Sequence, residues 1–484
     1  MILTSIALTS TLLTGLMIEP KLHNPFGVAW GFLYGYQGVP SPRFMPELRR
    51  IGGSWTKLYL IWNQVEPEPG KYDWRAVDTF LAQLKSPDEA LLSVFSTSTW
   101  ATRTKATILP PSPAKNADDY DRFIRELVRH CKGRVRYFQN DSEPNNPVYW
   151  SGTSSEFAAE TRAFSKAVRE TDPHAKVILG GYDGLFNPGP GFKFPTQEAS
   201  LKFFRDVLAQ APNTFDYFDL RLYADPSTIP ARVQYIRSMM AELGEEKPIV
   251  CTEYNGPGFF EFPDNLKYVQ LVMKWSASVA NQSTDRGGGG VAELYRDPKT
   301  LKPQTQMFLF DVDPVLDAKL RRIQCRDLVE RNLYALSAGV QRTLFWDLWH
   351  DTTEHNDVMA LMYGKLKLFD YANGKLDNPY PAAISFSRMS RNLAGVESVR
   401  RIEVPGSPLI RLFEARCGSR GTVLVAWKHG PAFAEEPADT PVEFAWSSPR
   451  ASAQDALGDS VKVSVKEGKV SLAIGATPVF IVAH

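Results

Sequence analysis

Residues 136 to 146 read RYFQNDSEPNN, in which a short run of strand-forming residues leads into a group of polar side chains. Pro144 lacks a backbone N–H and cannot continue a sheet, so the strand is expected to end at about Asn140. Glu143 then lies at the carboxyl end of this strand. In a barrel of parallel strands, the carboxyl ends carry the catalytic residues. The stretch therefore predicts a barrel strand together with a candidate catalytic carboxylate.

A second stretch, KPIVCTEYNG at 247–256, has the same form. A buried strand ends in the carboxylate of Glu253, and turn-forming residues follow it. Because side chains alternate along a strand, Ile249, Cys251 and Glu253 are expected to share one face. Glu253 should then end a row of side chains that lines the barrel.

Short apolar, β-branched runs alternate with amphipathic stretches from about residue 25 to 350. This alternation predicts a parallel sheet covered by helices. Eight such runs, at about 40 residues per unit, fit a (β/α)8 TIM barrel with enlarged loops. A doubly wound open sheet would show the same alternation, but no Gly-rich phosphate-binding turn follows the first run. The expected strands are Gly27–Trp30, Trp55–Trp62, Leu91–Ser96, Arg136–Asn140, Lys176–Gly180, Phe215–Tyr223, Pro248–Glu253 and Thr343–Phe345.

Helices are expected between these strands, at Asp118–His130, Ser155–Glu170 and Arg232–Leu243, where apolar residues recur at helical spacing. Two connections are unusually long, one at Asn187–Gln197 and one at about 287–303. Loops that leave the carboxyl ends of barrel strands form the active face, so both are expected to shape a cleft. The run of four glycines at 287–290 is interpreted as a flexible linker.

The pattern divides the chain into a barrel at 25–380 and a C-terminal all-β sandwich at 381–484, where strand-like runs are separated by turn residues. The apolar run at 2–17 is shorter than the roughly 20 residues that a membrane span needs. Residues 1–24 resemble a secretion signal without its basic start or a clear cleavage site. We expect export to the periplasm or the extracellular space. A loosely packed leader on a cytoplasmic protein is the alternative.

Charge and composition exclude several classes of partner. Lys and Arg number 55 against 54 Asp and Glu, so no net field attracts nucleic acid or an acidic membrane. Seven His and four distant Cys match no metal-ligand spacing, and no cofactor or metal is expected. The cysteines are interpreted as free, buried thiols. Eleven Trp suit the flat faces of sugars, although most Trp residues belong to protein cores.

Two carboxyl groups that flank one bond are what the hydrolysis of a sugar acetal needs. One carboxyl group donates a proton to the leaving oxygen, and the other, ionised, attacks the anomeric carbon. Glu143 and Glu253 follow the fourth and seventh expected strands, whose carboxyl ends meet at the mouth of a closed barrel. Carboxyl groups about 5–5.5 Å apart would retain the anomeric configuration. Either glutamate alone could instead be a structural partner of Lys or Arg.

Residues 62–74 read WNQVEPEPGKYDW, which resembles the motif W-x-x-V-E-P-x-x-G-x-Y-D-W after the second strand of clan A glycoside hydrolases. Ser142–Asn145 resembles the clan's Asn-Glu-Pro acid/base motif, and Thr252–Tyr254 resembles its nucleophile motif. Over most of residues 25–350, the chain is similar to the family of β-xylosidases and α-iduronidases and its relatives. The resemblance implies a retaining glycoside hydrolase that cleaves oligo- or polysaccharides, with Glu143 as general acid/base and Glu253 as nucleophile.

The residue before the acid/base glutamate departs from the clan pattern. Ser142 stands where the clan has the Asn that holds a sugar hydroxyl, and its side chain is shorter with a single hydroxyl group. Asn140 and Asp141 are the candidates to compensate for it. All three residues are therefore expected to contact substrate.

Two more departures lie on other strands. Lys57 replaces a clan arginine on the second strand, which loses the bidentate fork of a guanidinium. The clan's His-x-Tyr on strand six reads Arg221-Leu222-Tyr223. The resemblance gives Tyr223 the role of orienting the nucleophile, while Arg221 has no counterpart there.

Three tryptophans near strand ends, Trp62, Trp100 and Trp346, are candidates to contact the sugar, and Trp346 resembles the clan's stacking platform. Core packing is the alternative for such rings. The cluster from His350 to Asp357 matches no ligand spacing and is interpreted as a solvated loop.

Three alternatives to a hydrolase remain. A transglycosylase would pass the glycosyl group to a sugar instead of water. A catalytically inactive, carbohydrate-binding relative is suggested by Ser142 and Lys57, although both glutamates are retained. A metal- or phosphate-dependent barrel enzyme is disfavoured by the missing ligand motifs.

Overall fold

The computed structural model describes residues 24–30, 43–182, 197–283, 288–348, 357–372, 375–436 and 438–483. The expected leader at 1–24 lies outside these residues except for Asn24, as does the expected loop at 187–197 up to residue 196. The part of the polar cluster from 350 to 356 also lies outside them. Within the described ranges, no helix combines the length and the apolar character needed to cross a bilayer.

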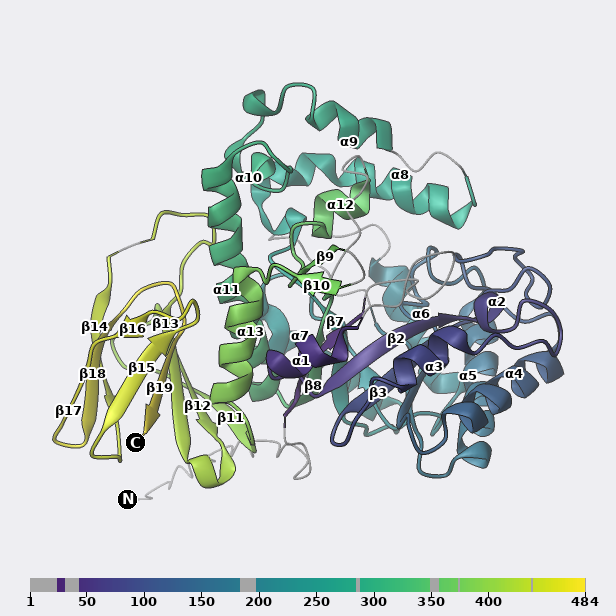
Figure 1. Cartoon of the computed structure of the whole chain (residues 1–484), viewed down its shortest axis with the longest axis horizontal. Coiled ribbons are helices and arrows are strands. Elements are labelled where there is room, and N and C mark those ends of the chain that lie inside the picture. Colours follow the sequence, from purple (N-terminus) through teal and green to yellow (C-terminus); the bar gives the residue numbers. More distant parts are fainter. Residues whose placement is uncertain are drawn as a thin grey trace, which may run out of the picture.

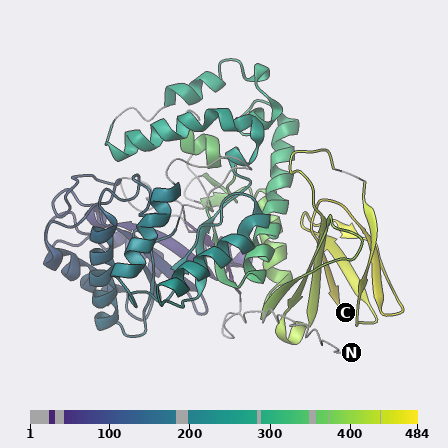
Figure 2. The same cartoon turned by 180° about the vertical axis from the view of Figure 1, so that it is seen from behind.

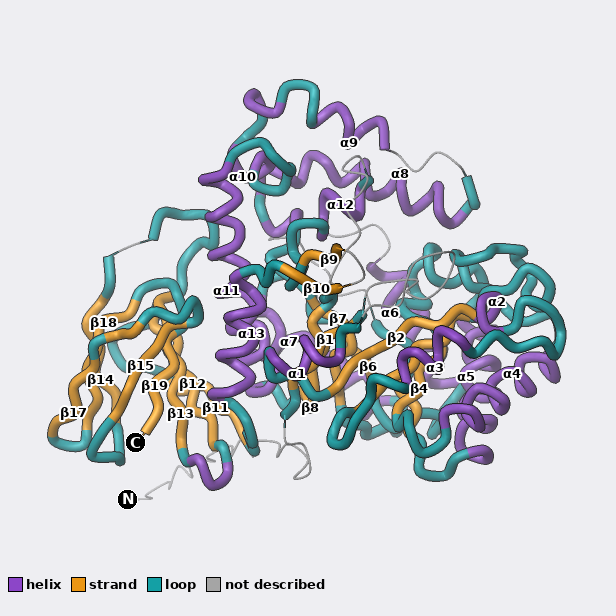
Figure 3. Tube along the Cα trace, viewed as in Figure 1, coloured by secondary structure: helices purple, strands orange, loops and turns teal. Residues whose placement is uncertain are grey.

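Eight parallel strands form a nearly closed barrel in the order β5-β4-β3-β2-β1-β8-β7-β6 (Figures 1 and 3). At the remaining seam, Ile178 and Leu220 each form an isolated parallel bridge that links the β5 and β6 segments. The expected TIM barrel is confirmed. Its strands are β1 (Phe26–Ala29), β2 (Trp55–Ile61), β3 (Glu89–Phe95), β4 (Tyr137–Asn140), β5 (Lys176–Ile178), β6 (Phe218–Asp219), β7 (Ile249–Tyr254) and β8 (Val340–Phe345).

Helices run along the outer side of the barrel, as Figure 2 shows from behind. Local signals set their starts: the Asn116 side chain accepts from the N–H of Asp118 at the start of α4, and Thr153 and Glu156 form a capping box at the start of α5. The helices of this part are α1 (Met45–Arg50), α2 (Trp62–Val65), α3 (Arg75–Leu81), α4 (Ala117–Cys131), α5 (Ser154–Thr171), α6 (Gln197–Gln210), α7 (Ile229–Glu242), α11 (Pro314–Ser337) and α12 (Val358–Tyr363).

Between β7 and α11 the chain forms a helical insertion above the barrel in Figure 1, with α8 (Val269–Ala280), α9 (Gly288–Leu294) and α10 (Pro303–Gln306). It has its own apolar core, which includes Phe259, Phe262 and Phe308. The interpretation of the glycine run as a linker is wrong for Gly288–Gly290, because these residues begin α9. A Cβ on Gly290 would lie 2.4 Å from Leu271 Cδ2, so a side chain there would require Leu271 of α8 to change its conformation.

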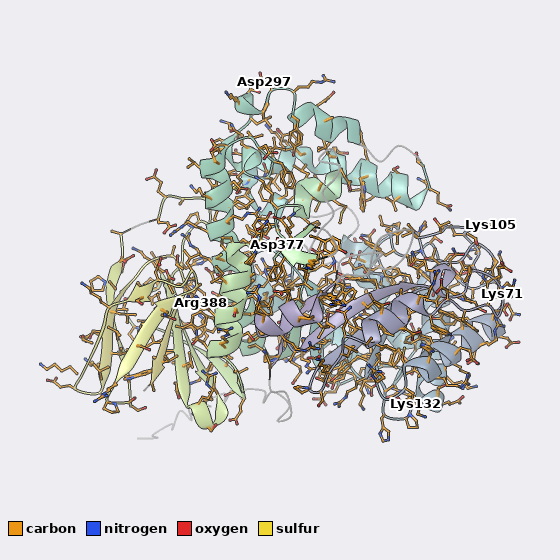
Figure 4. All side chains as sticks on the ribbon, in the orientation of Figure 1. Lys71, Lys105, Lys132, Asp297, Asp377 and Arg388 are labelled. Carbon is orange, nitrogen blue, oxygen red and sulfur yellow. The ribbon has the colours of Figure 1, made fainter. Side chains whose placement is uncertain are left out.

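Antiparallel sheets follow the barrel, as expected for the C-terminal part. One has six strands in the order β11-β12-β13-β19-β15-β16, the other three in the order β14-β18-β17. Helices α11 and α13 (Pro381–Asn392) lie between them and the barrel (Figures 1 and 2). Arg388 of α13, which is labelled in Figure 4, donates to Gln454 of β15 at 2.9 Å. The remaining strands are β9 (Asp370–Ala372), β10 (Lys375–Asp377), β11 (Ser398–Ile402), β12 (Ile410–Arg416), β13 (Thr422–Lys428), β14 (Thr440–Ala445), β15 (Ala451–Asp455), β16 (Ser460–Val461), β17 (Val463–Lys466), β18 (Lys469–Ile474) and β19 (Val479–Ala483).

All four cysteines are free and buried, as expected. Cys251 packs with Ile249 in the large core that includes the outer helices, whereas Val250 packs with Trp55 and Leu344 among residues of the other barrel strands. The set that contains Val250, Trp55 and Leu344 therefore lines the interior of the barrel.

Candidate active site

Charged side chains from four segments of the barrel meet at one place near the carboxyl ends of its strands. Lys57 belongs to β2, Glu143 follows β4, Arg221 follows β6 and Glu253 belongs to β7. Arg221 contacts both glutamates: its Nε lies 3.0 Å from Glu143 Oε1, and its Nη2 lies 3.6 Å from Glu253 Oε2. Two carboxylates that are 110 residues apart in the chain therefore contact one guanidinium group.

Both glutamate side chains keep a small exposed fraction, 10% for Glu143 and 12% for Glu253, whereas Arg221 is 1% exposed. The carboxylates are thus accessible from solvent, while the guanidinium group lies behind them. Such a pair at the mouth of a barrel is suited to reach a bound molecule.

Glu253 is held by two phenols. Tyr59 donates to Oε2 at 2.6 Å and Tyr223 donates to Oε1 at 2.7 Å. Burial raises the pKa of both phenols, and the charge of Glu253 raises it further, so they remain protonated donors. Tyr223 therefore makes the contact with Glu253 that the resemblance implied, and Tyr59 adds a second that the sequence did not indicate.

The alternation predicted for β7 is wrong, because the strand contains a bulge. Ile249 and Cys251 do not continue into Glu253 on one face, because the pairing of β7 with β8 shifts register between Ile249 and Cys251 and again between Cys251 and Tyr254. Bulges of this kind change the direction of a side chain. As a result, the neighbouring residues Thr252 and Glu253 both reach the charged group.

Burial raises the pKa of the Glu253 carboxyl, but the opposing charges of Arg221 and Lys57 and the two phenol hydrogen bonds outweigh it and hold the pKa below its usual value. Glu253 is therefore ionised at neutral pH. An ionised carboxylate with both oxygens oriented is what a nucleophile at an anomeric carbon requires.

Lys57 is completely buried beside Glu253. Its Nζ donates to Thr252 Oγ1 at 3.1 Å and lies 3.9 Å from Glu253 Oε2. Burial and the nearby Arg221 lower the pKa of this ammonium group to about 7, against the attraction of Glu253. Lys57 therefore changes its charge near neutral pH.

Arg221 is bound on every side. Its Nη1 donates to Asp219 at 2.6 Å and to Thr252 at 2.8 Å, and its Nη2 donates to Ser142. Asp219 is fully buried and accepts further hydrogen bonds from Gln139 and Thr252. The guanidinium group is thus fixed by a rigid polar network.

The backbone leaves room for this group only because residue 181 is glycine. A Cβ on Gly181 would lie 2.3 Å from Arg221 Cζ. The pair Gly180–Gly181 at the end of a barrel strand is the signal from which close approach of another group could have been inferred.

Glu143 lies in a turn whose backbone is strained. Both Asp141 and Glu143 have φ of 52°, in the left-handed region that non-glycine residues rarely adopt. Each such residue costs about 1–2 kcal/mol, and such conformations cluster at functional sites. The turn directs Glu143 towards Arg221, and Ser142 joins it there.

Asn140 and Asp141 do not take over the contact of the missing asparagine. Both are fully buried: Asn140 donates to Thr161 of α5 at 2.9 Å, and Asp141 accepts from the N–H of Ser96 at 2.9 Å. Their side chains turn into the core between strand and helix. In the described conformation neither is accessible to a substrate.

A pair of buried acids lies behind the strand end. Burial raises the pKa of Asp141 to about 7, and burial together with the charge of Asp141 raises the pKa of Glu160 well above its usual value. Ser96 contacts both, through its N–H to Asp141 and its hydroxyl to Glu160. At neutral pH the pair holds at least part of its protons.

Of the three candidate tryptophans, Trp346 lies nearest to the charged group. It packs with Tyr59, and its ring meets Tyr363 at 5.2 Å, which in turn meets Tyr223 at 5.9 Å. It is 8% exposed. Its use as a sugar platform stays a prediction.

Trp62 and Trp100 have another environment. Trp62 is fully buried and stacks on Phe123 of α4, and its Nε1 donates to Glu66 at 2.8 Å. Trp100 meets Trp62 edge to face and donates to the backbone oxygen of Glu66. Their described contacts include each other, α4 and the loop after β2, and they stabilise that loop.

The contacts of Glu66 explain the residue pattern of the motif after β2. Its carboxylate accepts from Trp62, from the N–H of Gly70 at 2.7 Å and from Arg122 at 3.0 Å. Gly70 has φ of 74°, which explains the glycine at this position. The most specific motif of the sequence resemblance therefore stabilises the loop after β2.

Comparison with known proteins adds information only at the level of the fold. No protein-family model matches the chain, and no curated protein matches it by sequence. Solved structures do match. A family 39 glycoside hydrolase from Bacteroides cellulosilyticus WH2 superposes with a TM-score of 0.62 at 14% identity, covering 96% of this chain and 81% of that one.

Two further matches cover nearly the whole of both chains. A family 39 β-xylosidase from Caulobacter crescentus has a TM-score of 0.58 at 13% identity, with 98% of each chain covered. A family 51 α-L-arabinofuranosidase from Bifidobacterium longum has a TM-score of 0.56 at 11% identity, with 100% of this chain and 98% of that one covered. The chain therefore shares its fold, including the C-terminal β sheets, with clan A glycoside hydrolases.

Proposed function

We propose that this protein is a retaining glycoside hydrolase in which Glu253 attacks the anomeric carbon and Glu143 acts on the opposite side of the scissile bond. The observation that carries the proposal is the contact of both carboxylates with Arg221, from the ends of β4 and β7. Two carboxyl groups about 5–5.5 Å apart would give double displacement through a covalent glycosyl-enzyme.

The environment of Glu253 supports its role. An attacking carboxylate has to be ionised and correctly oriented, and Tyr59 and Tyr223 bind one oxygen each. The neighbouring cations keep the pKa of Glu253 low.

The substrate is a carbohydrate under this proposal, and the acceptor is water or a second sugar. Ser142 in place of asparagine removes a hydrogen-bonding group next to the acid/base residue, and its hydroxyl is already engaged by Arg221. We infer that the sugar is held by groups other than those usual in the clan.

A catalytically inactive, carbohydrate-binding protein is the second candidate, and one observation favours it. The hydrogen bond from Arg221 stabilises the ionised form of Glu143, whereas a general acid has to be protonated before it donates. Binding without turnover would follow if the reaction required that proton.

The test is a screen of the purified protein against aryl glycosides and polysaccharides, with the anomers of the products followed by NMR. Retained configuration in the first-formed product supports the proposal. Inverted product would contradict double displacement, and glycan binding with no turnover of any substrate would favour the inactive protein. A product that carries an added sugar would identify a transglycosylase.

A further inference from the structure

Arg221 occupies a position that conflicts with ordinary acid catalysis by Glu143. Its Nε donates to Glu143 Oε1 at 3.0 Å from a side chain that is 1% exposed. A charge-assisted hydrogen bond of this kind is stronger than a neutral one and stabilises the ionised carboxylate. Because Asp219, Thr252 and Ser142 also hold the guanidinium group, it cannot turn away without breaking buried hydrogen bonds.

The other charges around Glu143 act in both directions. The carboxylates of Glu253 and Asp219 favour its protonation, and the ammonium group of Lys57 favours its ionisation. The phenols of Tyr59 and Tyr223 stay neutral, because burial and the charge of Glu253 raise their pKa. Arg221 is in direct contact with Glu143, and Coulomb energy falls with distance, so the guanidinium dominates.

We propose that Arg221 is a positioning residue that keeps Glu143 as a carboxylate, so that the site cleaves glycosides whose aglycone departs without receiving a proton. This inference rests on the proposed function and narrows its substrate class. Phenols and carboxylic acids are stable as anions and can leave in this way, whereas the alkoxide of an alcohol or of another sugar cannot. Acyl glycosides and glycosides of acidic phenols are therefore the expected substrates.

The steps balance without an added acid. An oxygen of Glu253 forms a bond to the anomeric carbon while the bond to the aglycone oxygen breaks, and the aglycone leaves as an anion with the bonding electron pair. Water then attacks the same carbon, and the bond to Glu253 breaks. Glu143, already a carboxylate, accepts the proton of the attacking water and releases it to solvent.

The first experiment uses the wild-type protein and four substrates: the 2,4-dinitrophenyl, 4-nitrophenyl, phenyl and methyl glycosides of the sugar identified in the screen. General acid catalysis is worth about 10²–10⁴-fold, and without it kcat/KM is expected to fall by at least about 10³-fold from the first substrate to the phenyl glycoside. The Glu143→Ala variant should show the same steep dependence in the glycosylation step. A wild-type rate that hardly depends on the leaving group would overturn the inference.

The second experiment changes Arg221 itself. Arg221→Met would leave the buried Asp219 uncompensated, so it is combined with Asp219→Asn, which removes both charges of the pair. In this double variant, the phenyl glycoside is expected to gain about 10²-fold relative to the dinitrophenyl glycoside, and this gain should disappear at high pH, where Glu143 loses its proton. Arg221→Lys keeps the positive charge and should retain the steep dependence.

A folded double variant with the wild-type ratio of the two substrates would contradict the role given to Arg221. If the double variant does not fold, the wild-type series decides alone. Turnover of all four glycosides at similar rates overturns this inference but leaves a glycoside hydrolase. No turnover of any of them, including the dinitrophenyl glycoside, removes both proposals.

Discussion

Tyr223 and Glu253 are joined by a hydrogen bond of 2.7 Å between the phenol oxygen and Oε1 of the carboxylate. The phenol comes from the segment after β6 and the carboxylate from β7, so the parallel pairing of these two strands brings them together. Tyr59 binds the other oxygen from β2. A carboxylate fixed from two sides loses little further freedom when it forms a bond, which is an advantage for a nucleophile.

Glu253→Gln is expected to abolish turnover. The amide keeps the size of the side chain and can still meet the two phenols, but it cannot form a stable glycosyl ester. Loss of a nucleophile lowers kcat by more than about 10⁴-fold. Steady-state hydrolysis of a dinitrophenyl glycoside measures the effect, with the exposed Glu246→Gln as control. Hydrolysis at the wild-type rate by the Glu253 variant would remove the assignment.

Glu143→Ala is expected to keep some cleavage of substrates with good leaving groups and to be rescued by added azide. Formation of the glycosyl-enzyme needs only Glu253 when the aglycone leaves as an anion, but water then lacks its general base. Azide needs no base and enters the space left by the side chain. The product to detect by NMR is a glycosyl azide of retained configuration.

The control for azide rescue is Glu253→Gln, in which azide cannot restore the covalent route. An equal rate for Glu143→Ala with and without azide, and no glycosyl azide, would show that Glu143 does not act as the base. Azide that attacks in place of Glu253 would give a glycosyl azide of inverted configuration, so a retained glycosyl azide from Glu253→Gln would show that the two roles are assigned wrongly.

The sequence predicted the strand ends at which Glu143 and Glu253 lie, since each is a local pattern. Glu143 precedes a proline after a strand, and Glu253 ends an apolar run. The observed β4 and β7 end within one residue of the expected strands. Local alternation of strand and helix was also sufficient for the barrel.

Local sequence patterns could not predict which segments contact one another. Arg221 meets Glu143 only because β4 and β6 converge, and no local feature of either segment indicates the other. The bulge at Cys251 reverses the alternation expected for β7, because pairing with β8 decides the register. Asn140 and Asp141 turn towards α5 and Ser96, with which they form hydrogen bonds in the core.

Lys57→Met is expected to stabilise the fold and to impair the site. Burial lowers the pKa of Lys57 to about 7 in the folded protein, so below pH 7 the folded state holds a buried charge that the unfolded chain holds in water. The free energy of unfolding therefore rises between pH 7 and about 10 in the wild type as this proton is lost. Met removes the destabilising buried charge, and the rise in the free energy of unfolding between pH 7 and about 10 should disappear with it.

The measurement for Lys57 is urea unfolding at pH 6 and pH 9, with kcat/KM for a dinitrophenyl glycoside in parallel. The variant is expected to gain about 1–2 kcal/mol at pH 6 and less at pH 9, and to lose activity because Glu253 loses a neighbouring cation. Exposed Lys71→Met is the control. A variant that is less stable at pH 6 than the wild type would show that the ammonium group is a net stabilising partner of Glu253.

The buried acids Asp141 and Glu160 are expected to make the fold less stable as pH rises. Burial raises the pKa of Asp141 to about 7 and that of Glu160 well above its usual value, so the folded protein keeps protons that the unfolded chain loses near pH 4. The contribution of the two protonated acids to the free energy of unfolding is fully present below about pH 4 and is lost as pH rises through 7. Each unit of pKa difference corresponds to about 1.4 kcal/mol, so a loss on the order of a few kcal/mol is expected.

Urea unfolding at pH 4.5 and pH 7.5 measures this loss, and the variant that tests its source is Asp141→Asn/Glu160→Gln. Its amides keep acceptors for the N–H and hydroxyl of Ser96 but carry no titrating proton. The difference in unfolding free energy between the two pH values should be smaller in this variant by about 2 kcal/mol or more. Burial also raises the pKa of Glu261 to about 7 and of Glu330 to about 8. Because both groups are present in the wild type and in the variant, only the difference in pH dependence between these two proteins reports on Asp141 and Glu160. The exposed Asp118→Asn variant should behave as the wild type, and an unchanged pH difference in the double variant would mean that the pair is already ionised when it is buried.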